Sequence, residues 1–446
     1  MQAILSRLRQ SASIKVLTIG FLILVLLIPL GMIKGTVAGR DQTSLAAKQD
    51  IQRTWGKSQL IAGPVLVVPY DIVHVNDRGE RIINKSQLYF LPKDLDIESA
   101  VDAEVRYRGI HKVPVYSTLT TLSGTINWPA AEGLGIDANN IHWINASIAV
   151  GISDARAIAE SPNLQLNGQT VPFVPGGQQI VGFPPLILAP IGKLIGDDLP
   201  ENLTFSITLS IKGSDALRFL PLGDTTTANM RSGWSSPSFS GSYLPDTRDV
   251  NDAGFTASWK ISSIGRTLPT SWSARSRSAE LASDSAFGVD LYMPISVYRL
   301  TLRATSYGIL FVGLTFVVYF LFETVAGLRL HPLQYLMVGL ANVLFYLLLV
   351  SFAEHIGFGL AYLLSSTASS ALTVGYSLSV LGGRTRGMVM AAILVVLYSF
   401  LYLTLNAENY ALLAGSLGLW VTLAMIMYLT RRIDWYTKSA GDNNEA

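Results

Sequence analysis

The sequence predicts an α-helical membrane protein with six transmembrane helices, one N-terminal and five C-terminal, and a large mainly-β domain between the first and second helix. Three observations support this fold class. Residues 304–430 consist of five apolar runs, residues 16–32 form another long apolar run, and the chain between them contains many short segments typical of β-strands. A domain of about 270 residues is therefore expected to lie outside the bilayer.

Residues 1–33 are predicted to form a cytoplasmic N-terminus and the first transmembrane helix. Arg7, Arg9 and Lys15 accompany the apolar run without any acidic residue. A cleaved signal peptide begins in the same way, and the small side chain of Ala38 would suit its cleavage site. The apolar run is longer than the roughly 7–15 residues of a signal-peptide core, and this favours a retained membrane anchor.

Residues 34–303 are predicted to form an exported, periplasmic domain. After a short helix at 41–55, β-branched runs bounded by Pro, Gly, Asn and Asp predict strands. The segment 203–211 alternates apolar and polar residues, which is typical of a half-buried strand. The other candidates lie at 64–70, 87–91, 101–107, 113–122, 141–152 and 163–166. Many short strands indicate a sandwich or a large antiparallel sheet assembly.

Two segments of this domain have unusual compositions. Residues 162–200 are rich in Gly and Pro and are compatible with a division into two β subdomains. Trp234, Tyr243 and Trp259 belong to a later segment in which aromatic residues lie among Ser, Thr and Gly. Such residues form either a surface that binds a glycan or a β core, in which each buries about 150–250 Å². We consider the core the stronger interpretation.

Five apolar runs then form the transmembrane domain, residues 304–430, which is followed by a cytoplasmic tail, residues 431–446. The runs cover residues 307–322, 333–352, 358–381, 388–405 and 411–430. About 20 helical residues are needed to cross about 30 Å of hydrocarbon. A water-soluble protein cannot cover five consecutive helices that are apolar all round, so a buried helical core is the weaker interpretation.

Charges between these runs predict the orientation of the helices. Basic residues follow the first, third and fifth run, namely Arg329, Arg384, Arg386, Arg431, Arg432 and Lys438. The second and fourth runs are followed instead by Glu354, His355 and Glu408. Because Lys and Arg accumulate in short cytoplasmic loops, we expect both termini in the cytoplasm of a bacterial cell, with the protein in the inner membrane.

Composition and motifs argue against several classes of function. The formal net charge of +2 gives no reason to expect a nucleic-acid partner. The absence of cysteine excludes disulfides, cysteine metal sites and a thiol nucleophile. The sequence contains no Gly-x-Ser-x-Gly, no His-Glu-x-x-His and no phosphate-binding loop, and its five histidines lack metal-ligand spacing. We therefore predict no catalytic residue, no cofactor and no metal site.

Polar residues at the ends of the membrane helices are the candidate functional residues. Glu323 ends one apolar run and is followed by Arg329 and His331, while Glu354 and His355 are expected at the opposite face of the bilayer. Charges at this depth are costly unless they are paired or hydrated. They are either ion or lipid contacts or, as we favour, interfacial anchors with a structural Glu–Arg pair.

Small residues recur every four positions in the run 358–381, at Ala361, Ser365, Ser369, Thr373 and Ser377. Such a face allows two helices to approach closely and to exchange weak hydrogen bonds. A hydrophilic pathway is the alternative, although no charged residue within the membrane accompanies this face. We favour helix packing.

Several separated motifs resemble those of CreD-type inner-membrane proteins. They cover residues 322–324, 329–332, 334–336, 339–340, 345–349 and 354–355, with Trp234, 237–239, 244–245, 254–255 and 433–436 outside the membrane core. The resemblance implies a cell-envelope integrity protein of the Gram-negative inner membrane, linked to a two-component response, colicin tolerance and β-lactam susceptibility. It supplies no catalytic residue. The shared residues transfer only as motif positions: Glu323, Arg329, His331, Glu354, His355, Asp434 and Trp435.

Two functional hypotheses follow. In the first, a non-enzymatic envelope protein anchored in the lipid bilayer presents its β domain to a periplasmic protein or glycan partner. In the alternative, a transporter or lipid-handling protein binds its substrate with Glu323 and the small-residue face. A membrane hydrolase acting through the Trp-rich segment is a weaker third hypothesis. The sequence does not indicate an oligomeric state.

Overall fold

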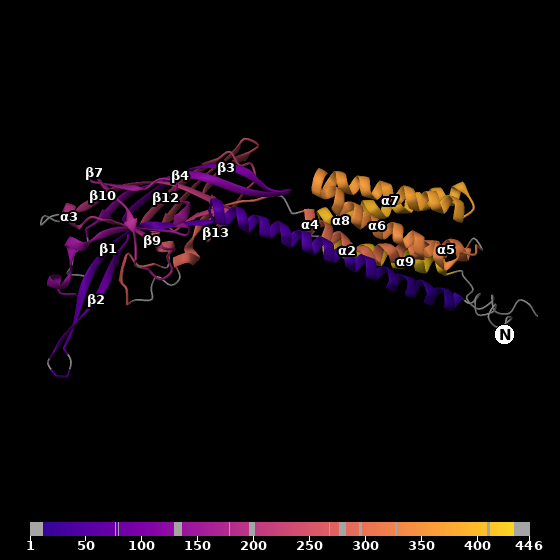
Figure 1. Cartoon of the computed structure of the whole chain (residues 1–446), viewed down its shortest axis with the longest axis horizontal. Helices are drawn as coiled ribbons and strands as arrows, with labels where there is room; N and C mark the ends of the chain where they lie inside the picture. The colour runs from indigo at the N-terminus through magenta and orange to yellow at the C-terminus, as the bar shows by residue number, and fades with distance from the viewer. Residues whose placement is uncertain are drawn as a thin grey trace, which may run out of the picture. The chain divides into compact units, whose positions relative to one another are not determined.

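The computed structural model describes residues 12–431, apart from residues 76, 79, 129–135, 178, 196–200, 267, 276–281, 294–296, 326–327 and 408–410. The chain forms two compact units, both drawn in Figure 1. The helical unit consists of Met1–Leu45 and Ile295–Ala446, and the β unit consists of Ala46–Pro294. An N-terminal apolar helix, a large mainly-β domain and a C-terminal helical block follow one another, as the predicted fold class requires.

The first helix is longer than its apolar run. α2 (Ala12–Trp55) is continuous over 44 residues and includes both the apolar run and the short helix expected at 41–55. The connecting residues contain no proline after Pro29, and most residues from 40 to 53 are of types that tolerate or favour a helix. α2 contributes its residues up to Leu45 to the helical unit and the remainder to the β unit.

The rest of the helical unit is α4 (Val297–Ser306), α5 (Gly308–Val325), α6 (Pro332–Ile356), α7 (Phe358–Val380), α8 (Arg384–Asn406) and α9 (Ala411–Thr430). The last five coincide with the predicted apolar runs, whereas α4 was not predicted. Within the described residues, α2, α6 and α8 are each long and apolar enough to cross a membrane, and α4 with α5 forms a fourth candidate that is bent by 44°. α7 contains many Ser and Thr residues, and α9 contributes the shorter apolar segment Leu413–Met425.

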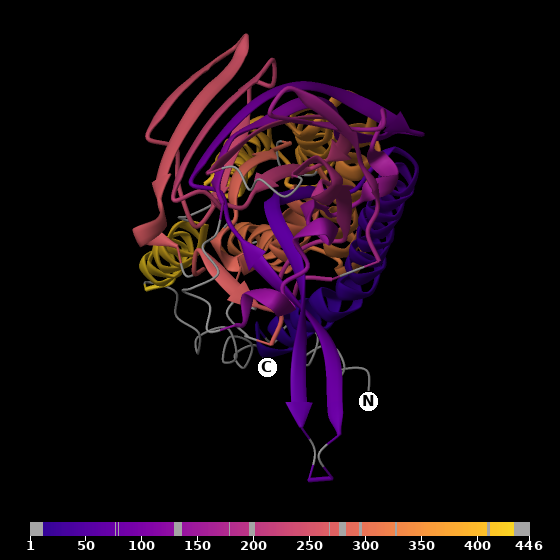
Figure 2. The same ribbon diagram turned by 90° about the vertical axis from the view of Figure 1, so that its left-hand side faces the viewer.

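The β unit contains two sheets. The first, in the described residues, joins nine strands: β1 (Gln59–Val75), β2 (Arg81–Phe90), β5 (Ser147–Ile152), β8 (Val174–Pro175), β9 (Leu186–Pro190), β11 (Ala216–Phe219), β13 (Pro237–Gly241), β16 (Ser271–Ser273) and β17 (Phe287–Leu291). Their order is β13-β17-β11-β1-β5-β9-β8, with β2 paired to β1 and β16 paired to β2. The hairpin of β1 and β2 extends beyond the rest of this sheet, as Figure 2 shows.

The second sheet joins eight strands: β3 (Asp94–Arg108), β4 (His111–Asn127), β6 (Asn163–Leu166), β7 (Gln169–Pro172), β10 (Asn202–Ser214), β12 (Thr225–Ser232), β14 (Thr247–Asn251) and β15 (Gly254–Ser262). Their order is β14-β15-β12-β3-β4-β10-β6-β7. The pairing is antiparallel except between β12 and β3, and in the first sheet between β1 and β11. Short helices complete the unit at Gly192–Ile195, Ala138–Asn140, Trp143–Asn145, Ala155–Ala157, Ser263–Gly265 and Ala282–Ser285.

The two sheets share one hydrophobic cluster. β10 illustrates how the sequence pattern creates it, because its alternate residues Leu203, Phe205, Ile207, Leu209 and Ile211 are all buried. This confirms the alternation predicted at 203–211. The strand expected at 141–152 is shorter than predicted, because its first part includes the short helix Trp143–Asn145 and only β5 joins the sheet.

The Gly- and Pro-rich segment 162–200 contributes strands to both sheets. β6 and β7 belong to the second sheet, and β8 and β9 belong to the first. Leu164, Val171, Leu186 and Ala189 from these strands are all members of the shared hydrophobic cluster. The segment therefore passes from one sheet to the other within a single compact unit.

Candidate functional site

The helical unit places one buried carboxylate at the end of α5. Glu323 is only 5% exposed, and its Oε1 lies 2.5 Å from Nζ of Lys15 on α2. The Tyr335 hydroxyl donates to Oε2 at 2.9 Å, and the Leu330 amide donates to Oε1 at 3.1 Å. Glu323 therefore has one cation and two neutral hydrogen-bond donors, and these offset the free-energy cost of removing its charge from water.

The prediction that Glu323 pairs with Arg329 is wrong. Arg329 is exposed, and Lys15 from the distant N-terminal helix forms the ion pair with Glu323. His331, which the sequence also placed near Glu323, begins α6 as its N-cap. Its Nδ1 accepts from the Leu333 amide at 3.3 Å, and its own amide donates to the Gln334 side chain at 2.8 Å. These reciprocal bonds satisfy two amides that the first turn of a helix leaves free.

A second carboxylate lies at the end of α6. The Glu354 side chain is 10% exposed, its Oε1 lies 3.7 Å from Nε of Arg40, and the Tyr298 hydroxyl donates to it at 3.2 Å. His355 is exposed, with Nδ1 3.0 Å from the carbonyl oxygen of Ser351 one turn earlier. Glu354 and His355, adjacent in sequence, therefore make separate contacts.

α2 supplies the cation to both carboxylates. Lys15 and Arg40 are about 25 residues apart on this helix, which corresponds to about 37 Å along its axis. That separation exceeds the roughly 30 Å of a hydrocarbon core and is close to the thickness that includes the headgroups. The two ion pairs hold α2 against α5 and α6, one at the start of its apolar run and the other about eight residues beyond the end of that run. The remaining motif positions, Asp434 and Trp435, lie outside the described residues.

The three aromatic residues considered as a candidate binding surface, Trp234, Tyr243 and Trp259, do not all reach solvent. Trp259 is 2% exposed and packs against Phe287 and Phe239 in the core of the β unit. Tyr243 is half-buried, with its hydroxyl donating to the Gly265 carbonyl at 2.6 Å. Trp234 is half-buried as well, and its indole N–H lies within hydrogen-bond distance of two backbone carbonyls. A surface built from all three is excluded because Trp259 does not reach solvent, and the core interpretation holds for it.

A shallow, open groove of about 500 Å³ lies instead on the exposed face of the second sheet, where charged side chains are mixed with apolar residues and glycines. Its strands are β3, β12, β14 and β15, and the strand register places Asp249, Thr256, Arg231 and Ala100 in one row across them. Residues directly opposite in a sheet share a face. Asp102, two residues beyond Ala100, lies on that face as well. Asp102, Arg231, Asp249 and Thr256 are all exposed.

Gly254, which lines this groove, is required by the local backbone conformation. Gly254 has φ +137°, and a Cβ atom there would lie 2.0 Å from the carbonyl oxygen of Ser232. A larger residue is therefore excluded without a backbone shift. No local sequence motif marks the groove, because its walls come from separate strands between residues 100 and 256.

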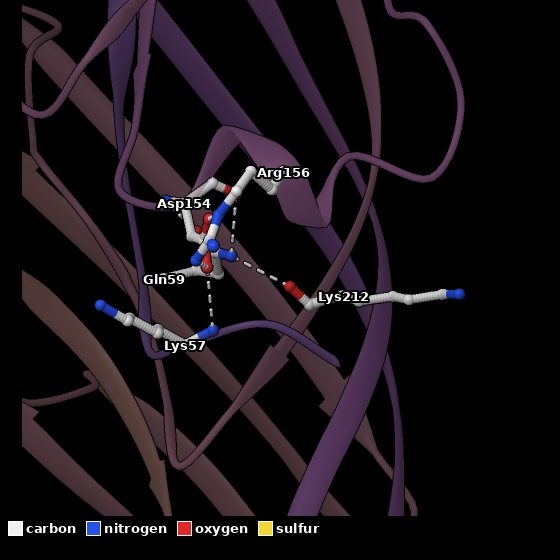
Figure 3. A network of polar contacts seen from close by, with 5 residues as sticks. All are labelled: Lys57, Gln59, Asp154, Arg156 and Lys212. Atoms are coloured by element: carbon white, nitrogen blue, oxygen red, sulfur yellow. Dashed lines mark hydrogen bonds and ion pairs between the residues drawn. The ribbon is translucent and has the colours of Figure 1, made fainter. Parts of the chain in front are cut away.

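A buried polar network joins the start of β1, at Gln59, to the segments around Asp154 and Lys212 (Figure 3). The Gln59 side chain, 1% exposed, donates to the Lys212 carbonyl at 3.0 Å and accepts from the Asp154 amide at 3.2 Å. Arg156 donates to both carboxylate oxygens of Asp154, at 2.8 and 3.0 Å, and the Lys57 amide lies 3.4 Å from the same carboxylate. The bonds from Arg156 lower the pKa of Asp154 below its ordinary value.

This network predicts a pH-dependent contribution to stability. A carboxyl with a lowered folded-state pKa stabilises the fold above its unfolded value of 3.8 and loses that effect as the pH falls through the folded value. Asp154→Asn is therefore expected to destabilise the β unit at pH 7, and the difference from the wild type should disappear as the pH falls through the lowered folded-state pKa, which lies below 3.8. Urea unfolding of the full-length protein in detergent, followed by tryptophan fluorescence, measures this. Asp252→Asn, at an exposed position, is the control, and a pH-independent difference for Asp154→Asn would contradict the assignment.

In the part of the chain that the structure describes, no group of three or more His, Asp or Glu side chains is arranged to hold a metal ion. A set of apolar helices joined to a large domain of two β-sheets defines an integral membrane protein with a substantial extramembrane domain. The family model described as Inner membrane protein CreD matches residues 11–436, and the chain belongs to the CreD family.

The comparison with one curated protein agrees with this assignment. Inner membrane protein CreD of Escherichia coli (strain K12) is 31% identical over 433 residues, which are 94% of this chain and 92% of that protein. Among solved structures, a substrate-bound mutant of an M1 zinc metallopeptidase from Deinococcus radiodurans aligns with 39% of this chain and 39% of its own at 16% identity. The TM-score of that alignment is 0.20, which is too low to indicate a shared fold.

Proposed function

We propose that this chain is a non-enzymatic inner-membrane protein that supports cell-envelope integrity by binding an envelope component with its β unit. Membership of the CreD family supports a role in the envelope. The basic residues after α5, α7 and α9 support an orientation with both termini in the cytoplasm and the β unit in the periplasm. Tolerance of colicins and of β-lactams belongs to the same proposal, as a consequence of a maintained envelope.

The groove on the second sheet is the observation that carries the proposed binding mode. The strand register places Arg231 between Asp102 and Asp249 on the exposed face, and among the described residues it forms no ion pair with either. Charged groups of both signs can therefore contact a polar partner, such as an extended protein segment or a glycan. Exposed and unpaired Arg side chains, which present five donors in a planar fork, suit such recognition.

In-cell photocrosslinking tests the groove. A photoreactive residue at Thr256, inside the groove, is expected to capture one defined protein or glycan species, because a bound partner lies against this row of strands. The matched control is Thr208, an exposed threonine on β10 of the same sheet and outside the groove. Arg231→Ala is expected to reduce capture from Thr256 about 5- to 30-fold, since a central Arg contact contributes about 1–2 kcal/mol.

Two results would remove this proposal. Equal capture from Thr256 and Thr208, or capture that Arg231→Ala leaves unchanged, would show that the groove is not the binding surface. Turnover of a lipid, glycan or peptide by the purified protein, lost on a single side-chain change, would instead establish an enzyme. The transporter or lipid-handling alternative no longer gains support from Glu323, because Lys15, Tyr335 and Leu330 already satisfy its carboxylate.

A further inference from the structure

The middle of the helical unit contains a buried track of hydroxyl groups. α7 follows α6 after a single residue, Gly357, and packs on it. Ser365, Ser369, Thr373 and Ser377 of α7 are all buried, and they extend over about 12 residues, or about 18 Å of helix. Part of this track is bonded: Ser369 donates to the Ala341 carbonyl at 2.8 Å and accepts from the Tyr398 hydroxyl at 3.0 Å, and Ser377 bonds the Tyr319 hydroxyl.

Several buried polar groups, two in this track and two on α6, have no hydrogen-bond partner among the described residues. Asn342 of α6 is fully buried, and neither its Oδ1 nor its Nδ2 forms a hydrogen bond. The hydroxyls of Tyr346, Ser365 and Thr373 are buried without a partner as well. Ser and Thr can rotate to bond a carbonyl of their own helix. The Asn342 amide and the phenolic Tyr346 hydroxyl have no such local bond, so these two groups need a partner from outside their own helix.

Their position in the fold is central. Asn342 follows Ala341, whose carbonyl accepts the bond from Ser369, so it lies next to the point where α6 and α7 meet. Tyr346 is one turn further along α6, on the same face as Asn342. Asn342 lies about ten residues, or about 15 Å, from the start of α6, which is half of a hydrocarbon core of about 30 Å. Unpaired polar groups are least tolerable at this depth.

We propose that Asn342 and Tyr346, together with Ser365 and Thr373, bind ordered water molecules and form a hydrated site at the membrane midplane. A buried water makes about two to four hydrogen bonds to polar groups that otherwise lack partners, and these four side chains offer both donors and acceptors. The site is neutral, because α7 carries no charged residue and the charges of α6 lie at its far end, at Glu354 and His355. It therefore suits water and uncharged hydroxyl compounds rather than ions.

X-ray radiolysis of the full-length protein in lipid nanodiscs tests this site, with water as the probe. Radiolysis converts bound water to hydroxyl radicals, which oxidise the side chains beside it. Tyr346 is expected to be oxidised several times faster than Tyr362, a control that is also buried but whose hydroxyl donates to the Tyr398 carbonyl at 2.7 Å. A Tyr346 rate equal to or below that of Tyr362 would overturn the proposal.

Asn342→Leu provides a second measurement, because it replaces the amide by an apolar group of similar size. If the site is hydrated, the substitution slows Tyr346 oxidation several-fold and lowers the melting temperature, since the water loses a partner. If the site is dry, removal of an unpaired amide raises the melting temperature and leaves Tyr346 oxidation unchanged. Should Asn342→Leu fail to accumulate, the comparison of Tyr346 with Tyr362 in the wild type decides the question.

Discussion

Glu323→Ala is expected to lower the free energy of unfolding of the full-length protein by about 2–4 kcal/mol, since removal of one partner of a buried ion pair leaves the other charge uncompensated. Lys15 then loses its counter-charge, and the Tyr335 hydroxyl and Leu330 amide lose their acceptor. The value lies toward the lower end of the range for buried pairs because the Lys15 side chain is 34% exposed and can reach water. Thermal or SDS-induced unfolding in detergent measures the change.

The partner of Glu323 is identified by a double-mutant cycle. Lys15→Met combined with Glu323→Ala should destabilise the protein by less than the sum of the two single substitutions, because the residues share one interaction. Arg329→Met is the matched control, and its exposed side chain should change stability by less than about 0.5 kcal/mol. If Arg329→Met were coupled to Glu323→Ala and Lys15→Met were not, the assignment of Lys15 as the partner of Glu323 would be wrong.

Arg266→Met is expected to destabilise the β unit by about 3–5 kcal/mol, the range for breaking a buried charged interaction. The Arg266 side chain is 1% exposed and donates to three backbone carbonyls, those of Leu222, Gly223 and Leu268, and to Asp224 Oδ1 at 3.0 Å. Burial lowers the pKa of this guanidinium, while Asp224 opposes that change. Removal of the guanidinium leaves three carbonyls without their donor in a site that excludes water.

Urea unfolding of the full-length protein, followed by tryptophan fluorescence, reports on this change, because Trp259 and Trp272 are buried in the β unit. Arg248→Met, at an exposed position on β14, serves as the control and should remain within about 0.5 kcal/mol of the wild type. Arg266→Lys keeps the charge but has fewer donors, so its stability should be intermediate. A wild-type unfolding curve for Arg266→Met would show that the buried guanidinium contributes nothing to the fold.

The contacts of Glu323 and Glu354 change how the membrane domain can be interpreted. Both carboxylates are bonded to basic residues of α2 at the ends of the helices, which is a structural arrangement. In the described part of the helical unit, the buried polar groups without partners lie in the middle of α6 and α7 and carry no charge. A transport or lipid-handling role would therefore have to use this neutral central region, and the radiolysis experiment examines the same residues.

Local sequence pattern was sufficient for the fold class. The apolar runs at 16–32 and 304–430 became α2 and α5–α9, and the alternation at 203–211 became β10 with its apolar residues buried. Helices and strands have fixed periods of 3.6 and 2 residues, so a window of about ten residues reveals which face is apolar. The family was also accessible from sequence, because its motifs are short and contiguous.

Only the tertiary structure decided which residues meet. Glu323 pairs with Lys15, which is 308 positions away, rather than with its neighbour Arg329. The groove brings together Asp102, Arg231 and Asp249 from strands that are remote in sequence. Secondary structure depends on backbone hydrogen bonds between near neighbours, whereas these contacts depend on which helices and strands pack together, and no local period encodes that choice.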